Sequence, residues 1–175
     1  MSTLNINGDS NDPFYRYKMP LLISRQAGRG NGCYTILENL PEVTKALNTP
    51  ATIVFKYMGS VLGSNTTESK WSITGHYKSE ELIDILYQYI NSFVMCPNCN
   101  IPELMPSKEG KKKNTKLNLT CSACGNSEIK IFKNKEEEKG GDLILKFLEN
   151  NDWPISKGIM VEQSLDTFDP FSDLI

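Results

Sequence analysis

The chain has 175 residues, of which 39% are hydrophobic, and its formal charge is -2 at pH 7. This composition suits one mid-sized domain or two small ones and excludes a fibrous or wholly disordered protein. No stretch approaches the ~20 apolar residues of a membrane span, and the polar start MSTLNINGDSND lacks the features of a signal peptide. We therefore expect a cytoplasmic protein that does not bind membranes.

The charge is unevenly distributed along the chain. Residues 142–175 contain seven of the 21 acids and two of the 19 basic residues, a net charge of -5. Residues 1–141 consequently carry a net +3. A basic body and an acidic tail favour different partners, although a surplus of three charges alone is weak support for nucleic-acid binding.

The first part of the chain alternates short extended segments with turns. The segment 1–12 is short and polar, which predicts disorder. A strand over 21–24 and another after the sequence QAGRGNG are expected to flank a loop, because the pair Asn31-Gly32 is a strong hairpin signal. Pro41 suits the first turn of a short helix that Pro50 ends.

The period of the apolar residues changes in the middle of the chain. Residues 51–63 are β-branched and aromatic, and KWSIT alternates, so both predict strands. From Ser79 onward the spacing is helical. The apolar stripe of this helix, which we expect to cover the sheet, consists of Leu82, Leu86, Tyr89, Ile90 and Phe93.

Two C-x-x-C pairs carry the strongest chemical signal in the sequence. Their 21-residue separation is one residue beyond the roughly 15 to 20 typical of four-cysteine zinc ribbons. Four sulfur ligands close a tetrahedral site and leave no position for water, so the expected Zn²⁺ is structural. A redox dithiol is the alternative. The predicted ligands are Cys96, Cys99, Cys121 and Cys124.

Strands over 101–105, 116–120 and 128–132 complete the predicted ribbon. The lysines at its tip fit either phosphate contacts or a solvated turn: Lys108, Lys111, Lys112 and Lys113.

Beyond the ribbon, KNKEEEKGG predicts a solvated linker, Asp142 predicts the start of a short helix, and DTFDPFSDLI predicts a docking segment. Cys33 is expected to be a small buried hydrophobe, and His76 a polar residue at a strand end.

Six sequence blocks resemble a known family. They are DPFYRYKMP, GRGNG, KALN, KYMGSVLG, FVMC and CSACG, and their order is similar to the N-terminal half of eukaryotic translation initiation factor 5 over about 12–132. The related initiation factor 2 beta subunit shares the helix-plus-ribbon plan but lacks the FYRYKMP opening. Family members continue into a C-terminal helical domain, whose functions we do not carry over.

The resemblance implies a GTPase-activating protein that acts in trans on initiation factor 2, with GTP bound to the partner's gamma subunit. The family's proposed catalytic arginine matches Arg16, and a family lysine matches Lys56. A second family lysine is Tyr34 here, which favours reduced activation. For Arg16, stacking on a neighbouring tyrosine or binding phosphate is the alternative. The glycine-rich loop has no Walker G-K-[ST], so we expect no GTP binding by this chain alone.

The resemblance also implies an RNA-facing loop near the decoding site. Glycines let backbone approach RNA, and arginines contact phosphate. The loop would face initiator tRNA and mRNA on the small ribosomal subunit, and an ordinary flexible hairpin fits equally well. The implied RNA-binding residues are Arg25, Gly28, Arg29, Gly30 and Asn31.

These observations together predict an α+β protein with a small mixed sheet, covering helices, a zinc ribbon and a partly disordered acidic tail. The expected parts are a flexible arm (1–20), an α/β domain (21–94), the ribbon (95–133) and an acidic linker and tail (134–175). We expect a monomeric translation initiation factor that stimulates GTP hydrolysis during start-codon selection. The alternatives are a ribosome- or tRNA-binding module without activation, or a beta-like subunit.

Overall fold

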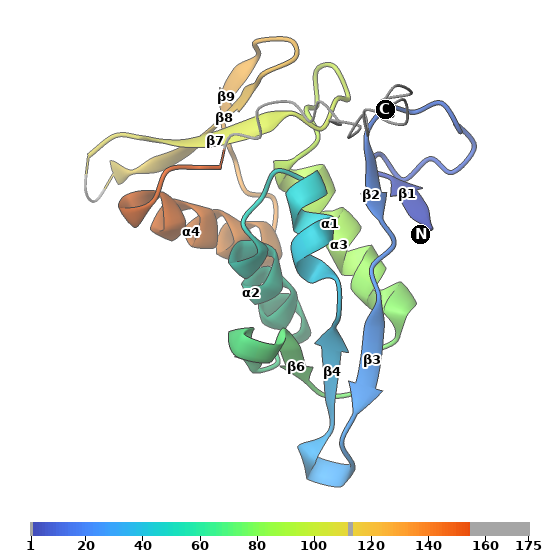
Figure 1. The fold of residues 1–175 in the computed structure, drawn as a ribbon. Coiled ribbons are helices and arrows are strands. Elements are labelled where there is room, and N and C mark those ends of the chain that lie inside the picture. The colour runs from blue at the N-terminus through green and yellow to red at the C-terminus, as the bar shows by residue number, and fades with distance from the viewer. Residues whose placement is uncertain (1, 112–113, 155–175) are drawn as a thin grey trace, which may run out of the picture.

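The computed structural model describes residues 2–111 and 114–154 and has an α+β fold (Figure 1). Predictions for Lys112, Lys113 and the tail over 155–175 lie outside these residues. The helices are α1 (Leu40–Ala46), α2 (Ala51–Leu62), α3 (Ser79–Phe93) and α4 (Lys135–Asn150). The strands are β1 (Thr3–Asn5), β2 (Lys18–Pro20), β3 (Ser24–Ala27), β4 (Tyr34–Leu37), β5 (Thr66–Thr67), β6 (Ser72–Thr74), β7 (Leu104–Glu109), β8 (Lys116–Cys121) and β9 (Ser127–Ile129).

The strands form three antiparallel sheets. One is the β1–β2 hairpin, the second has the order β3-β4-β6-β5, and the third has the order β7-β8-β9. We call the second sheet with α1, α2 and α3 the body, and residues 95–133 with the third sheet the ribbon. Figure 1 shows the ribbon at one end of the molecule and the β3–β4 turn at the other.

The core lies between α3, α2 and the four-stranded sheet. The predicted apolar stripe of α3 is confirmed, because each of its five residues is at most 3% exposed. Tyr57 of α2 meets Tyr89 and Phe93 of α3 edge-on, with ring centroids 5.3 and 6.5 Å away. Such tilted contacts suit the aromatic quadrupole. No helix within residues 2–111 and 114–154 is long and apolar enough to cross a membrane.

The prediction of a strand over 51–63 is wrong, because these residues form α2. The Pro50 carbonyl accepts a hydrogen bond from the Ile53 amide at 3.1 Å, and Gly63, with a φ of 63°, ends the helix. The buried residues Ile53, Val54, Phe55, Tyr57 and Met58 recur at helical spacing. Burial of this face outweighs the strand preference of its β-branched and aromatic side chains.

The prediction of disorder over 1–12 is wrong for its first part. β1 pairs with β2, and Ile6 is only 2% exposed in the same core as Met19. A short polar segment has no core of its own, but here two apolar side chains enter that of the body. The predicted strand over 21–24 is also displaced, since β2 ends at Pro20 and β3 begins at Ser24. Whether residues 1–20 act as a flexible arm stays a prediction, as does the four-part division.

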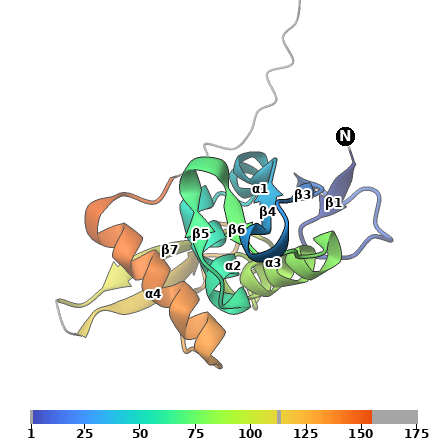
Figure 2. The same ribbon diagram turned by 90° about the horizontal axis from the view of Figure 1, so that it is seen from below.

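The predicted linker KNKEEEKGG is instead the start of α4. The Asn134 side chain caps the helix by accepting a hydrogen bond from the Glu137 amide at 2.8 Å. A Cβ added to Gly140 would lie 2.6 Å from the Phe93 ring, and one added to Gly141 would clash with Phe132. Gly140 therefore lets α4 approach α2 and α3 closely, and Gly141 lets it approach the segment after β9. Figure 2 shows α4 beside α2.

The remaining sequence predictions agree with the structure in kind. The loop after QA joins β3 to β4, the helix at Pro41 is α1, and KWSIT contains β6. The ribbon has its three predicted strands, although the first begins at Leu104 and the third ends at Ile129. Ser79 is the first residue of α3, not its cap, and its hydroxyl lies 2.8 Å from that of Ser24.

Candidate metal centre and exposed arginine loops

The four cysteines of the ribbon converge on one point. Their Sγ atoms all lie within 4.8 Å of one another. The pairs Cys96–Cys124 and Cys99–Cys121 each have sulfurs 3.7 Å apart. A tetrahedral ion with metal–sulfur bonds of ~2.3 Å needs sulfur–sulfur edges of ~3.8 Å. A disulfide needs about 2.05 Å, so the geometry fits a metal ion and not two disulfides.

Each cysteine pair is shaped by the same backbone turn. The Asn100 amide donates to the Cys96 carbonyl at 2.9 Å, and the Gly125 amide donates to the Cys121 carbonyl at 2.9 Å. Asn100 and Gly125 have positive φ angles of 54° and 75°. Asparagine and glycine are the residues that adopt this conformation most readily. The residue after each C-x-x-C pair thus closes the turn that presents both sulfurs.

The thiols of the cluster differ in acidity. Burial raises the pKa of the Cys99 thiol to about 12. A hydrogen bond from the Asn98 side chain, at 3.5 Å, lowers the pKa of the Cys124 thiol to about 6. Four thiolates at this distance repel one another, so a cation is needed to stabilise all four together. The ligand set suits a metal ion that prefers sulfur.

Arg16 lies on the loop that joins β1 to β2. Phe14, Arg16 and Lys18 are exposed, whereas Tyr15 and Tyr17 are half-buried. The Arg16 guanidinium carbon is 5.9 Å from the centroid of the Tyr17 ring. Such a contact at an exposed site is weak, so the guanidinium remains accessible.

Local hydrogen bonds give this loop a definite shape. The Asp12 carboxylate accepts from the Phe14 amide at 3.0 Å, and the Lys18 ammonium donates to the Pro13 carbonyl at 2.8 Å. The Asn5 side chain donates to the carbonyls of Asp9 and Asp12. Phe14, which is 93% exposed, therefore projects from an ordered turn two residues before Arg16.

The predicted RNA-binding residues gather on the β3–β4 hairpin. Gly28 has a φ of 79°, and a side chain there would clash with the Gly32 carbonyl, so the tight turn requires glycine. Gly30–Gly32 form a short 3-10 turn, and Arg29 and Asn31 are exposed. Arg25, in contrast, is ion-paired with Glu38 at 2.7 Å. Arg29 is thus the arginine that the turn presents.

Lys56 lies on α2 and not on a strand. Its ammonium is 2.7 Å from the Glu68 carboxylate, with both side chains about half exposed. It borders a groove of about 240 Å³ together with Ser60, Lys139 and Lys146. No hydrogen bond or ion pair among residues 2–111 and 114–154 joins Lys56 to Arg16 or to the β3–β4 turn. The structure therefore does not assemble these predicted sites into one.

Three further residues with sequence predictions have ordinary surroundings. Tyr34, at the start of β4, is 37% exposed. Cys33 is half-buried, not fully buried as expected. The His76 ring lies 3.1 Å from the Ala27 carbonyl beside the first strand of the sheet.

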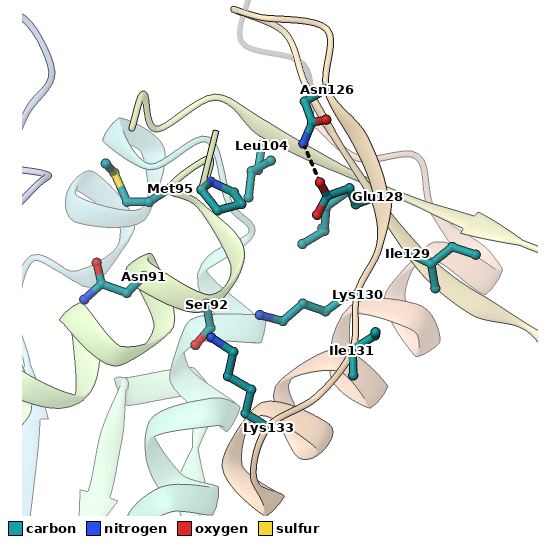
Figure 3. A pocket seen from close by; sticks show the side chains of 12 residues that line it. Asn91, Ser92, Met95, Leu104, Asn126, Glu128, Ile129, Lys130, Ile131 and Lys133 are labelled. Carbon is teal, nitrogen blue, oxygen red and sulfur yellow. Dashed lines mark hydrogen bonds between the residues drawn. The ribbon is translucent and has the colours of Figure 1, made fainter. Parts of the chain in front are cut away.

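A cavity of about 320 Å³ lies where α3 meets the segment after β9 (Figure 3). Met95, Leu104 and Leu119 form its apolar part, and Asn91 and Lys133 contribute polar groups. None of the residues predicted to bind metal, to bind RNA or to act in catalysis lines this cavity. It marks the joint between the ribbon and the body.

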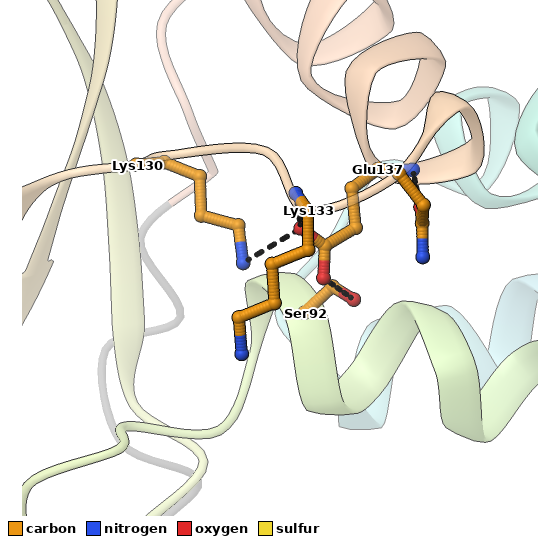
Figure 4. Close-up of polar contacts among 5 residues, drawn as sticks. Ser92, Lys130, Lys133 and Glu137 are labelled. Atoms are coloured by element: carbon orange, nitrogen blue, oxygen red, sulfur yellow. Dashed lines mark hydrogen bonds and ion pairs between the residues drawn. The ribbon is translucent and has the colours of Figure 1, made fainter.

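Sequence reasoning missed the polar cluster beside this joint (Figure 4). The Glu137 carboxylate, only 8% exposed, accepts from the Lys133 amide at 2.8 Å and the Ser92 hydroxyl at 3.2 Å, and Lys130 lies 3.6 Å away. Burial acts to raise the pKa of Glu137, but the Lys133 hydrogen bond and the Lys130 charge lower it below its ordinary value. The spacing Asn134-x-x-Glu137 resembles a capping box, and this pattern could have predicted the start of α4 from the sequence.

The comparisons with known proteins identify the family of this chain. Residues 7–127, which are more than half of the chain, match the family model of the domain found in initiation factors 2B and 5. The chain belongs to this family. The matched part contains the Arg16 loop, the β3–β4 hairpin, Lys56 and all four cysteines, whereas α4 lies beyond it.

Several similar relatives are named eukaryotic translation initiation factor 5. The Mus musculus protein is 39% identical over 127 residues, which are 70% of this chain and 29% of the relative. The Drosophila melanogaster protein is 39% identical over 129 residues, 71% of this chain and 27% of the relative. The Saccharomyces cerevisiae protein is 39% identical over 127 residues, 70% of this chain and 31% of the relative. The matched segment thus spans less than a third of each relative.

Proposed function

We propose that this chain acts in translation initiation by stimulating GTP hydrolysis on initiation factor 2 within the small-subunit preinitiation complex. The observation that carries the proposal is the position of Arg16. It is exposed on an ordered loop, at the place where the initiation factor 5 family has its proposed catalytic arginine. The protein would activate a partner GTPase in trans.

The chemistry of phosphoryl transfer explains why an arginine is suited to this role. Negative charge spreads over the oxygens of the departing γ-phosphoryl group, and a planar guanidinium can donate to two of them at once. An arginine supplied in trans accelerates hydrolysis by ~10³ to 10⁵, or about 4 to 7 kcal/mol of activation free energy. Phe14 provides an apolar anchor for the partner beside that cation.

We propose Zn²⁺ as the metal of the cysteine cluster, in a structural role. Four sulfur ligands at tetrahedral spacing leave no coordination position for a substrate or water. When bound, the ion would hold the two knuckles of the ribbon together. In zinc-finger peptides such binding contributes ~10 to 16 kcal/mol, so the ribbon would depend on it for folding.

The proposed partners follow from the family. They are the gamma subunit of initiation factor 2 with its GTP, the small ribosomal subunit, initiator tRNA and mRNA, and the protein would act as a monomer in the cytoplasm. Lys56 would assist activation once the partner displaces Glu68 from it. The names of the relatives support a role in initiation, and the sequence blocks around Arg16 support activation.

A second candidate function is binding to initiator tRNA or the ribosome without GTPase activation. The projecting β3–β4 turn with its exposed Arg29 favours it, as does Tyr34 at the position of a family lysine. A role as a beta-like subunit of initiation factor 2 is disfavoured, because this sequence carries the FYRYKMP block, which that subunit lacks.

Single-turnover GTP hydrolysis in ternary complexes on small subunits tests both candidates. Arg16→Ala should lower the rate by ~10³-fold or more without weakening binding to the complex. Arg29→Ala, an exposed arginine on the other hairpin, is the matched control and should weaken binding but retain the rate at saturation. Equal rates for the wild type and Arg16→Ala would remove the activation proposal and leave the binding module.

A further inference from the structure

One hydrogen bond joins the Arg16 loop to the ribbon. The Tyr17 hydroxyl donates to the Glu103 carboxylate at 2.7 Å, across 86 positions of sequence. This bond is the main cause of the raised pKa of Tyr17, so the hydroxyl keeps its proton at neutral pH. Tyrosine-to-carboxylate bonds of this length are charge-assisted and stronger than neutral ones.

The main chain of Glu103 is held by both cysteine knuckles. Its amide donates to the Ile101 carbonyl at 2.9 Å, and this carbonyl also accepts from the Cys96 amide at 3.0 Å. On its other side, the Glu103 carbonyl accepts from the Ser122 amide at 3.0 Å. Ser122 directly follows Cys121. Both cysteine pairs therefore contribute to the placement of Glu103, together with the Leu104 amide, which donates to the Val94 carbonyl at 3.2 Å.

The contacts of the loop differ on the two sides of Arg16. On the N-terminal side, the Phe14 amide donates to the Asp12 carboxylate within the loop, and the Tyr87 hydroxyl of α3 donates to the Asn5 carbonyl at 3.0 Å. The Tyr15 hydroxyl is buried and has no hydrogen-bond partner among the described residues. On the C-terminal side, Tyr17 reaches the ribbon through Glu103. Loss of this bond would remove the side-chain link from Tyr17 to the ribbon, while the Ile6 amide would still donate to the Tyr17 carbonyl at 3.0 Å.

We propose that Glu103 is a positioning residue, through which the metal-ordered ribbon holds Tyr17 and fixes the direction in which Arg16 is presented. The inference rests on the proposed function, because it assigns the metal centre a regulatory role in GTPase activation. Metal loss would release the Arg16 loop even where the body stays folded. The ribbon and the activating loop would then form one metal-dependent unit.

Amide hydrogen exchange of the full chain tests this link without any GTPase. In the Zn²⁺-loaded protein, Tyr17→Phe should raise exchange of loop residues 7–18 by about tenfold, while zinc content and exchange in β7 and β8 stay unchanged. Tyr15→Phe is the matched control, because it removes a hydroxyl that makes no bond to the described residues. Unchanged loop exchange in Tyr17→Phe would overturn the proposal.

The dependence on metal is tested by treating the wild type and Tyr17→Phe with a chelator. Chelation should raise loop exchange in the wild type to the level of Tyr17→Phe and add little in the variant, because the same bond is already absent. Restored protection on returning Zn²⁺ to the wild type alone would support the link. An equal rise in both proteins would overturn it.

Hydrolysis assays then separate this inference from the proposed function. Tyr17→Phe should lower the maximal single-turnover rate by about tenfold with an unchanged half-saturating concentration. Glu103→Gln keeps an acceptor oxygen without the charge and should lie between Tyr17→Phe and the wild type. If Arg16→Ala is inactive but Tyr17→Phe is fully active, the positioning role is overturned and the proposed function stands. If Arg16→Ala is fully active, the proposed function fails. The exchange experiment still tests whether the Tyr17–Glu103 bond orders the Arg16 loop.

Discussion

The body and the ribbon of this protein are stabilised by different forces. In the body, α3 alone buries six large apolar side chains that pack on α2 and the sheet. In the described part of the ribbon, the buried apolar residues are Leu117, Leu119, two prolines and two of the four cysteines. Ile129 and Ile131 are 44% and 82% exposed. Burial of apolar surface can stabilise the body, whereas the ribbon needs a cross-link.

This difference shows that one chain can contain a region stabilised by apolar burial and another stabilised by a cross-link. Contacts between the two regions then fix how they sit together. α4 and the Glu137 cluster form the joint between the two regions, because they contact α2, α3 and the ribbon. The Tyr17–Glu103 bond is a second connection between the two regions. The four predictions below test the body, the ribbon and the joint in order of decreasing effect.

Removal of the metal should have the largest effect and should be confined to the ribbon at first. We expect a loss of ~10 kcal/mol or more of stabilisation, which unfolds β7, β8 and β9 while α3 retains its helical signal. Circular dichroism with elemental analysis before and after chelation measures both. Cys121→Ser should behave like the chelated protein, and Cys33→Ser, outside the cluster, like the wild type. If the ribbon stayed protected from amide exchange after metal removal, it would not depend on the metal for its fold, and the contrast with the body would be wrong.

Leu86→Ala should destabilise the body and leave the metal centre intact. Leu86 is fully buried, and truncation of such a leucine leaves a cavity that costs about 2 to 5 kcal/mol. Urea unfolding followed by tryptophan fluorescence gives the free energy, and zinc content should equal that of the wild type. Loss of zinc in step with the unfolding of the body, at the same urea concentration, would show that the two regions are not independent.

Gly140→Ala should loosen the joint. Alanine favours a helix by about 1 kcal/mol, but the added Cβ would lie 2.6 Å from the Phe93 ring, which is itself packed on Tyr57 and Tyr89. We expect a net loss of about 1 to 3 kcal/mol, because this ring cannot move freely. Lys139→Ala, next to it on α4, is the control with little expected effect. A stabilised Gly140→Ala protein would mean that α4 does not pack this closely.

Glu137→Gln should have the smallest effect and a characteristic pH dependence. The pKa of Glu137 is lowered in the fold, so its stabilisation is fully present above the unfolded-state value of about 4.3 and is lost as pH falls through the lower folded-state value. Glutamine should cost about 1.5 kcal/mol at pH 7 and progressively less as the pH falls below about 4.3. Thermal unfolding over a range of pH measures the difference, which should shrink at low pH. A stability difference between the wild type and Glu137→Gln that does not change with pH would show that the charge of Glu137 does not stabilise the fold.

The features that the sequence predicted correctly have strong local signals. The stripe of α3 repeats at helical spacing over about three turns, and the cysteine pairs specify both the ribbon and the cluster of four sulfurs that could hold a metal ion.

The features that were missed depend on distant partners. α2 contains strand-favouring residues whose burial against α3 and α4 decides for a helix. β1 has too few apolar residues to be recognised before Ile6 is seen in the core of the body. The charged, glycine-containing start of α4 is typical of a linker until the rings of Phe93 and Phe132 are placed beside its glycines.

The sequence by itself determined the cluster of four cysteines, the amphipathic helix that carries the core and the family to which the chain belongs. These follow from residue types at short, regular spacings, and such local patterns do not need the rest of the fold. The tertiary structure alone decided that α2 is a helix, that α4 joins the body to the ribbon and that Tyr17 meets Glu103. Each of these depends on side chains that are far apart in sequence, so only the packed fold brings their interaction energies into effect.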